Sequence, residues 1–431
     1  MATPITDSAT GTFAYNVKDL SLADQGKRRA EWAFQSMPAL QSIRKHLIKT
    51  QPFRDLRIGA LIDISAETAN LVIALRDGGA SISVCSPNPI ATQDDIAASL
   101  VRDYSVPTFA IQGESDEVHA QHLDAVLGLK PHFLVDHDGE LLSRLIAKSP
   151  EAMEQTVAGS EATTRGLSRL RALAADGRLP YPVIAVGDSQ TKHLFNDRYG
   201  AAQSILDGIL RATHVLFAGL TVVVAGYGWC GQGVALKLKG LGARVIVTEI
   251  DPFKAVKAVM DGHRVMSMSE AASLGDLFIT VTGGRNIIGR EHFDKFKNGA
   301  ILCNAGHSSV EIDLEILGQL TLSRRSMRTW VEEFTLRDGR RIHVLAGGQA
   351  INFVANEGSP AAVMDLFLAH HALSVEYLLK HHSSLEKVVH PVPYDIDCQV
   401  ARARLESMGV KIDRLTLEQE QYLASLSEPA Q

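Results

Sequence analysis

The fold of this chain is decided by the stretch Leu220-Thr-Val-Val-Val-Ala-Gly-Tyr-Gly-Trp-Cys-Gly231. Gly226, Gly228 and Gly231 form the spacing G-x-G-x-x-G directly after the apolar run 222–225. In a strand–turn–helix unit the first glycine permits the tight turn, the second lets the backbone approach a pyrophosphate, and the third lets the helix pack closely on the strand. The helix N-terminus adds free N–H groups and a favourable dipole. The pattern predicts a dinucleotide-binding site.

An acidic residue follows this turn at the spacing typical of ribose recognition. The segment 244–248 has the apolar character of a second strand, and Glu249 follows it, 23 residues after Gly226. A carboxylate there accepts hydrogen bonds from both ribose hydroxyls and repels a 2′-phosphate. The sequence therefore predicts NAD, rather than NADP, as the cofactor.

Length and composition are those of an ordinary globular protein. The 431 residues suffice for two or three domains, and hydrophobic and charged contents of 45% and 21% indicate no unusual class. The net charge of −6 gives no electrostatic reason to expect nucleic acid or an anionic membrane as a partner. We also expect no membrane span and no signal peptide, because the chain has no run of about 18 apolar residues and begins Met-Ala-Thr-Pro.

Cysteines and histidines lack the spacing of metal ligands, so the sequence predicts no metal site. The cysteines are scattered and form no C-x-x-C: Cys85, Cys230, Cys303 and Cys398. This usage favours a reducing compartment, the cytoplasm. The pairs His370-His371 and His381-His382 lie on or beside one helical segment, where we expect a packed or solvated face.

Strand-like and helix-like segments alternate through the first half of the chain. Strands are predicted at 56–63, 81–86, 108–112, 132–136 and 181–186, and helices at 66–75, 93–100 and 160–174. Such alternation predicts a parallel, doubly wound sheet that binds ligands at the carboxyl ends of its strands. Those ends carry 63–65, 88–93 and 136–139.

A second alternating set starts near residue 203. It comprises the helix 204–213, the glycine turn, and strands at 277–282, 300–305 and 342–345. We therefore predict an α/β protein with two doubly wound parallel-sheet domains, the second an NAD-binding Rossmann domain. The predicted substrate-binding domain is 1–187 plus 359–395, the NAD-binding domain 203–357, and the C-terminal docking tail 396–431. The apolar helix 361–379 either returns to the first domain or bridges two subunits.

Further motifs resemble the S-adenosylhomocysteine hydrolase family over nearly the whole chain. They are Asp19-Leu-Ser-Leu-Ala-Asp-Gln-Gly26, Gln93-Asp94, Asp188-Ser-Gln-Thr-Lys192, Tyr199-Gly200, Gly226-Tyr-Gly228, Thr248-Glu-Ile-Asp-Pro252, Cys303-Asn-Ala-Gly-His307 and Leu417–Leu423. The compact segment 86–94 and the missing Lys/Tyr tail are similar to shorter archaeal and some bacterial members. In longer members that tail reaches the cofactor of a neighbouring subunit, so here the contact is absent or replaced. The resemblance implies a homo-oligomer, a tetramer or dimer.

The resemblance also implies a reaction on an adenine nucleoside with tightly held NAD. In the family the 3′-hydroxyl is oxidised to a ketone, a base removes the acidified 4′-proton, and the 5′ substituent leaves by β-elimination. Water then adds, and the ketone is reduced again. The protein supplies orientation, acid–base groups and exclusion of water.

Individual roles are carried over by matching positions. The resemblance implies that Lys192 holds and deprotonates the 3′-hydroxyl, and that His307 lies on the 5′ side. The implied cofactor contacts, beside the glycine turn and Glu249, are Thr163, Thr164, Thr282, Asn304 and Asn352. The implied substrate contacts are Ser65, Glu67, Thr68, Gln93 and Ser359.

The chain departs from the family pattern where the chemistry is expected. The family has a histidine and an aspartate where this chain has Asp63 and His137, so Asp63 could orient His137 as a proton shuttle. The family's Phe-Asp-Asn becomes Phe195-Asn196-Asp197, a second exchange, and we count Asn196 and Asp197 among the catalytic candidates. A family glutamate that contacts the sugar hydroxyls becomes Ala162, and a histidine becomes Ser359.

Three functions follow from these departures. The first is a nucleoside dehydratase, similar to the hydrolase-like enzymes expected to make angustmycin-type hexulose nucleosides. Ala162 would leave room for a bulkier anomeric carbon, and His137 would protonate the departing hydroxide. The second is ordinary adenosylhomocysteine hydrolysis, and the third is a non-catalytic NAD- or nucleoside-binding regulator of a true hydrolase. We favour the first, because a sugar hydroxyl left unpaired at Ala162 typically costs about 1–3 kcal/mol of substrate binding.

Overall fold

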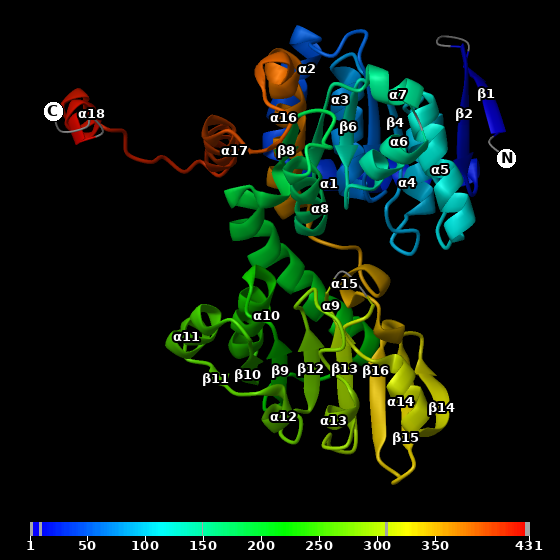
Figure 1. Cartoon of the computed structure of the whole chain (residues 1–431), viewed down its shortest axis with the longest axis vertical. Coiled ribbons are helices and arrows are strands. Elements are labelled where there is room, and N and C mark those ends of the chain that lie inside the picture. The colour runs from blue at the N-terminus through cyan, green and yellow to red at the C-terminus, as the bar shows by residue number, and fades with distance from the viewer. Residues whose placement is uncertain (1–2, 8–10, 149, 307–308, 427–431) are drawn as a thin grey trace.

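The computed structural model describes residues 3–7, 11–148, 150–306 and 309–426. Figure 1 shows two lobes, each built around one sheet with helices on its faces, and a C-terminal segment that extends away from both. The α/β class and the Rossmann architecture of the second lobe are confirmed.

The first lobe contains a nine-stranded sheet in the order β1-β2-β5-β4-β3-β6-β7-β8-β17. Its strands are β1 Thr3–Asp7, β2 Gly11–Val17, β3 Arg57–Leu61, β4 Ser81–Cys85, β5 Thr108–Ala110, β6 Phe133–Asp136, β7 Ala158–Glu161, β8 Val183–Ala185 and β17 Val389–Pro391. The strand order reverses between β3 and β6, which pair in parallel. The carboxyl ends of such a pair form a crevice for ligands, and here they lead into Asp63 and His137.

Helices cover this sheet on both faces (Figure 1). They are η1 Leu20–Leu22, α1 Ala23–Gln35, α2 Pro38–Thr50, α3 Ala66–Asp77, α4 Asp94–Arg102, α5 Asp116–Gly128, α6 Glu140–Lys148, α7 Pro150–Gln155, α8 Thr164–Ala175, α16 Ala361–His381 and η5 His382–Ser384. The start of α3 is fixed by Ser65, whose side chain accepts from the backbone N–H of Thr68 while the Thr68 hydroxyl accepts from the backbone N–H of Ser65. This capping box places the helix directly behind the end of β3.

The long helix α16 belongs to the core of the first lobe. Residues 361–384 are long and apolar enough to span a membrane by length and composition, but 67% of the most apolar window is buried inside the fold. Buried Asp365 accepts hydrogen bonds from the backbone N–H groups of Ala39 and Leu40 at the start of α2, at 3.0 and 2.8 Å. Packing against neighbouring helices therefore accounts for the apolar composition of α16.

The second lobe contains an eight-stranded sheet in the order β11-β10-β9-β12-β13-β16-β15-β14. Its strands are β9 Thr221–Ala225, β10 Arg244–Thr248, β11 Arg264–Val265, β12 Leu277–Thr280, β13 Ala300–Asn304, β14 Thr321–Arg328, β15 Val331–Leu336 and β16 Arg341–Leu345. Its helices are α9 Ala202–Thr213, α10 Trp229–Gly240, α11 Pro252–Met260, α12 Met268–Ala271, α13 Arg290–Phe293, α14 Leu314–Leu320, η4 Ala346–Gly348 and α15 Ile351–Val354.

The two predicted parallel sheets are confirmed, and each carries antiparallel strands at one edge. Strand β1 pairs with β2 in antiparallel fashion, and β14, β15 and β16 form an antiparallel edge. The sequence analysis also missed β7 and placed a single helix at 160–174, whereas α8 begins at Thr164. The sequence Ala-Gly-Ser-Glu of β7 lacks a strand-like apolar pattern. An added Cβ on Gly159 would lie 3.1 Å from the carbonyl oxygen of Leu134, so β7 packs tightly against β6 there.

Two segments cross between the lobes. One passes through η2 Val186–Asp188 and the π-helix η3 Lys192–Ala201 into α9, and the other returns from α15 to α16. The chain then ends in α17 Tyr394–Ser407 and α18 Leu417–Leu426, and Figure 1 shows α18 standing apart from both lobes. The predicted boundary at residue 396 falls inside α17, which buries Ile396 and Val400 against the first lobe.

Candidate functional site

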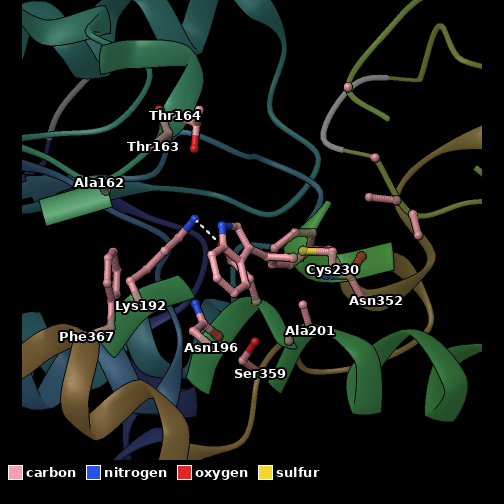
Figure 2. A pocket seen from close by; sticks show the side chains of 18 of the residues that line it. Ala162, Thr163, Thr164, Lys192, Asn196, Ala201, Cys230, Asn352, Ser359 and Phe367 are labelled. Atoms are coloured by element: carbon pink, nitrogen blue, oxygen red, sulfur yellow. Dashed lines mark hydrogen bonds and ion pairs between the residues drawn. The ribbon is translucent and has the colours of Figure 1, made fainter. Parts of the chain in front are cut away.

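A cavity of about 1580 Å³ lies between the two lobes, and both contribute to its walls. The first lobe supplies residues from the carboxyl ends of β3, β6 and β7, and the second supplies the glycine turn and the start of α10. Eighteen of the residues that line it are drawn in Figure 2. The predicted site residues that line the cavity are Asp63, Ser65, Glu67, Thr68, Gln93, His137, Thr163, Thr164, Lys192, Asn196, Asp197, Gly228, Thr282, Asn352 and Ser359.

The glycine turn has the geometry that a dinucleotide requires. Gly226 has φ of +100°, a conformation that favours glycine, and a Cβ on Gly231 would lie 2.0 Å from the carbonyl oxygen of Gly226. Gly228 is the N-cap of α10, and an added Cβ there would meet nothing within 4 Å. The backbone at Gly228 therefore faces open space in the cavity, with the N–H groups of the helix behind it.

The side chain of Glu249 holds the backbone of the glycine turn in place. Its carboxylate accepts hydrogen bonds from the backbone N–H groups of Tyr227 and Ile250, both at 2.7 Å, and of Asp251 at 3.1 Å. Gln232 and Asn352 line the cavity, and the side-chain oxygen of each is buried without a hydrogen-bond partner among the described residues. An open glycine turn with unpaired polar atoms beside it fits NAD.

Lys192 projects from η3 into the cavity and is held by a carboxylate. Its Nζ lies 2.9 Å from Oδ2 of Asp197, which also accepts a hydrogen bond from Nδ1 of His193 at 2.9 Å. The ring of His193 stacks on Trp229, with centroids 5.5 Å apart and planes at 12°. This network connects Lys192 to the first residue of α10. Figure 2 shows Lys192 extending between Ala162 and Cys230.

The structure shows different contacts for the two exchanged pairs, Asn196/Asp197 and Asp63/His137. Asp197 holds Lys192, whereas the buried Oδ1 of Asn196 lacks a hydrogen-bond partner within the described part of the chain. Asp63 and His137 both line the cavity, but the carboxylate recorded near His137 Nδ1, at 4.0 Å, is that of Asp138. That Asp63 orients or charge-stabilises His137 therefore stays a prediction.

Several candidate side chains are engaged in holding the site together. Thr163 caps α8, and its Oγ1 lies 2.7 Å from the carboxylate of Glu161 and 2.9 Å from that of Asp138. Burial, together with the nearby Asp136, raises the pKa of Glu161 to about 8. The Thr282 hydroxyl donates to Glu311 at 2.8 Å. The hydroxyls of Thr163 and Thr282 therefore bond to the protein, so any contact of theirs with NAD has to be shared.

The predicted substrate residues surround the start of α3. Ser65 donates to the Glu67 carboxylate at 2.8 Å, and burial raises the pKa of Glu67. Gln93 accepts from the backbone N–H of Ala66 at 3.2 Å. Ser359 lies at the return crossing, close to Gly200, where an added Cβ would be 3.1 Å from its Oγ. These residues bring both crossings and the end of β3 to one wall of the cavity.

Four predicted residues do not line the cavity: Gly226, Gly231, Glu249 and Asn304. The first three lie in or behind the glycine turn and shape it. Asn304 is fully buried, donates to the carbonyl of Gly348 at 2.9 Å and accepts from the N–H of Gly306 at 2.8 Å. Its side chain therefore anchors the loop that follows β13. His307 lies outside the described residues.

Sequence reasoning missed several residues of the cavity: His193, Trp229, Cys230, Phe367 and His371. His193 and Trp229 are sequence neighbours of recognised motifs, which was the available signal. His371 was expected on a packed or solvated face; it is packed, yet it also lines the cavity.

Within the described ranges, no group of three or more His, Cys, Asp and Glu side chains could hold a metal ion.

Fold and site together define a two-lobed, NAD-binding enzyme with a cavity between its lobes. Comparison with known proteins is consistent with this class. The family model described as "S-adenosyl-L-homocysteine hydrolase, NAD binding domain" matches residues 197–358, and the one described as "S-adenosyl-L-homocysteine hydrolase" matches residues 14–158.

Curated relatives match over nearly their full length. The chain is 50% identical to an adenosylhomocysteinase of Aquifex aeolicus (strain VF5), covering 95% of this chain and 98% of that one. It is 48% identical to an adenosylhomocysteinase of Gloeothece citriformis (strain PCC 7424), with 98% of each covered. It is 45% identical to one from Saccharolobus solfataricus, with 95% and 98% covered. The chain belongs to the S-adenosyl-L-homocysteine hydrolase family, and NAD is its cofactor.

Proposed function

We propose that the protein hydrolyses S-adenosylhomocysteine to adenosine and homocysteine. The observation that carries this proposal is Lys192, held by Asp197 at 2.9 Å in the cavity and connected through His193 to the start of α10. Relatives that are 45–50% identical over nearly the whole chain are named adenosylhomocysteinase. Their names support hydrolysis over the dehydratase favoured from the sequence.

Lys192 and Asp197 would serve the sugar hydroxyl that is oxidised. NAD, when bound, supplies the oxidation of this hydroxyl and its later reduction. Lys192 Nζ would hold the hydroxyl oxygen and take its proton, and Asp197 would stabilise the ammonium that results. The position of Asp197 beside both Lys192 and His193 keeps Nζ oriented toward the cavity.

Asp63 and His137 would serve the 5′ side of the nucleoside. They follow β3 and β6, the two strands between which the sheet order reverses. His137 would move a proton to or from the 5′ substituent as its bond breaks. The charge of the Asp63 carboxylate, in the same cavity, would stabilise the imidazolium form of His137. The two lobes would exclude bulk water from the ketone by closing on the substrate.

A product mass spectrum tests the proposal. The NAD-loaded protein is incubated with S-adenosylhomocysteine and, in parallel, with a hexulose adenine nucleoside. We expect adenosine and homocysteine from the first and no change in the second. An unchanged S-adenosylhomocysteine sample would refute the hydrolase proposal. The variant Lys192→Met should abolish product formation.

A second candidate, the hexulose nucleoside dehydratase, is favoured by one observation. The wall of the cavity at Ala162 is a buried methyl group, 7% exposed, and the catalytic candidates Lys192 and His137 line the same cavity. A sugar with an additional carbon substituent would find space there. Loss of one water from the hexulose nucleoside, with S-adenosylhomocysteine untouched, would establish this function instead.

We also propose that copies of the chain associate, as the family resemblance implies, and that the protein acts in the cytoplasm. Apolar side chains in and just before α11 and in the tail face solvent in the single chain: Ile250, Phe253, Met260, Leu417 and Tyr422. Surfaces of this kind commonly mark interaction sites. Sedimentation of the full chain and of a chain shortened before residue 409 tests whether the tail holds an oligomer together.

A further inference from the structure

His371 lines the cavity and carries a buried ring nitrogen that the proposed reaction does not use. The side chain is buried, 1% exposed, and lines the cavity, yet its Nε2 has no hydrogen-bond partner among the described residues. Its ring is held edge-on against Phe367, with centroids 4.9 Å apart and planes at 89°. Phe367 and His371 are four residues apart on α16 and therefore lie on one face of the helix. Both residues line the cavity.

The other ring nitrogen is fixed by Ser160 of β7. The Ser160 hydroxyl lies 3.1 Å from His371 Nδ1, and both residues are buried. A buried hydroxyl that only accepts would leave its own hydrogen without a partner, so Ser160 donates to Nδ1. The tautomer that remains carries its hydrogen on Nε2. His371, a residue of the cavity wall, therefore carries a donor without a partner among the described residues.

The charge state of His371 is also set by its surroundings. Burial, together with the nearby imidazoles of His370 and His137, lowers the pKa of His371 to about 3. The ring is therefore neutral at physiological pH and contributes a directed hydrogen bond rather than a cation. A neutral donor suits an uncharged acceptor such as a hydroxyl oxygen.

His371 lies on the same wall as Ala162. The ladder between β6 and β7 continues one residue past the strand, because the N–H of Ala162 donates to the carbonyl of Asp136 at 3.0 Å. Side chains two residues apart on an extended segment share a face, so Ala162 and Ser160 point the same way. Figure 2 shows Ala162, Phe367 and Lys192 together on one side of the cavity.

We propose that Nε2–H of His371 donates a hydrogen bond to a sugar hydroxyl of the bound nucleoside, at the wall where Ala162 offers no polar group. The proposal deepens the proposed function in assuming an adenine nucleoside as the ligand, but it requires no turnover. His371 is thus a specificity-determining residue, and Ser160 is the positioning residue that fixes its tautomer.

Equilibrium binding tests this contact. Dissociation constants for adenosine, 2′-deoxyadenosine and 3′-deoxyadenosine are measured by calorimetry on NAD-loaded wild type and His371→Phe. Phenylalanine keeps the ring and removes the donor. We expect adenosine to bind His371→Phe about tenfold more weakly, a typical effect of one hydrogen bond. For the deoxynucleoside that lacks the contacted hydroxyl, the two proteins should differ less than twofold.

A second variant and a control complete the test. Ser160→Ala leaves His371 in place but removes the hydrogen bond that fixes which ring nitrogen carries the hydrogen. It should therefore weaken adenosine binding about threefold, and the deoxynucleoside that lacks the contacted hydroxyl should again be less affected. His381→Phe changes an exposed histidine at the end of the same helix and should bind like wild type. Thermal unfolding of each variant reports whether it folds; Ser160→Ala decides the question if His371→Phe does not.

Two outcomes would overturn the contact: equal weakening for all three nucleosides, or no weakening for any. A wild-type protein that binds none of the three would overturn it as well. Selective weakening in a protein that fails to cleave S-adenosylhomocysteine would retain the contact and refute only the proposed function.

Discussion

Asp197 lies 2.9 Å from the ammonium of Lys192, while its neighbour Asn196 keeps a buried Oδ1 without a hydrogen-bond partner in the described chain. The order of these two residues is the reverse of the family's Asp-Asn. The lysine nevertheless retains a carboxylate, because η3 is a π-helix in which Asp197, five residues on, reaches Lys192. In this chain Lys192 thus has a carboxylate partner, and the amide of Asn196 lies elsewhere on the cavity wall.

The first prediction concerns this pair. Asp197→Asn should lower kcat by about 100-fold with a smaller change in KM, because the ammonium on Lys192 loses its counter-charge and Lys192 and His193 lose their shared acceptor. Steady-state cleavage of S-adenosylhomocysteine measures both constants. Asp207→Asn, which removes an exposed ion pair with Arg211 on α9, should leave them unchanged. Equal losses in both variants would contradict a special role for Asp197.

The second prediction concerns the glycine turn. Gly231→Ala should abolish NAD binding and destabilise the fold, since the new methyl would lie 2.0 Å from the carbonyl oxygen of Gly226. Gly240→Ala, at the other end of α10 with nothing within 4 Å, should bind NAD normally and gain up to about 1 kcal/mol of stability. Calorimetric titration with NAD and urea unfolding make the comparison. Normal NAD affinity in Gly231→Ala would show that the turn relaxes.

The third prediction concerns pH and stability in the first lobe. Hydrogen bonds to Glu114 and Glu140 raise the pKa of His119 from 6.5 to about 9. The folded state thus holds a proton that the unfolded chain releases above pH 6.5. This contribution is fully present below pH 6.5 and disappears as the pH rises to about 9.

Urea unfolding at several pH values checks the direction. After allowance for solvent screening, the free energy of unfolding of wild type should fall by about 1 kcal/mol more than that of His119→Gln between pH 6.5 and 9. Parallel curves for the two proteins would show that His119 is not protonated preferentially in the folded state.

The fourth prediction couples Ala162 to His371. Ala162→Glu would place a carboxylate on the wall where the family has a glutamate, so it should tighten adenosine binding about tenfold. With the carboxylate holding the sugar hydroxyls, His371→Phe should then have little further effect. A double-mutant cycle on adenosine dissociation constants measures this coupling. Additive effects would place the two residues at different parts of the ligand.

The local sequence pattern was enough to predict the elements on either side of the glycine turn. Strand β9 and helix α10 lie where the glycine spacing predicts them, because Gly226 and Gly231 are dictated by backbone geometry within one turn. Strand β7 was missed, because its four residues carry no hydrophobic period of their own and are held by ladders to β6 and β8. The antiparallel edge β14–β15 was missed as well; its outer strand is polar and exposed.

The sequence by itself determined the α/β class and the NAD-binding turn, since alternating segments and a glycine spacing are patterns of residues that are close together in the chain. Only the tertiary structure decided which carboxylate holds Lys192, that Asp63 and His137 line one cavity, and that His371 lines it as well. These relationships join a π-helix, three strand ends and a helix distant in sequence. Packing of the two sheets and their connecting segments sets such distances, and no local pattern encodes them.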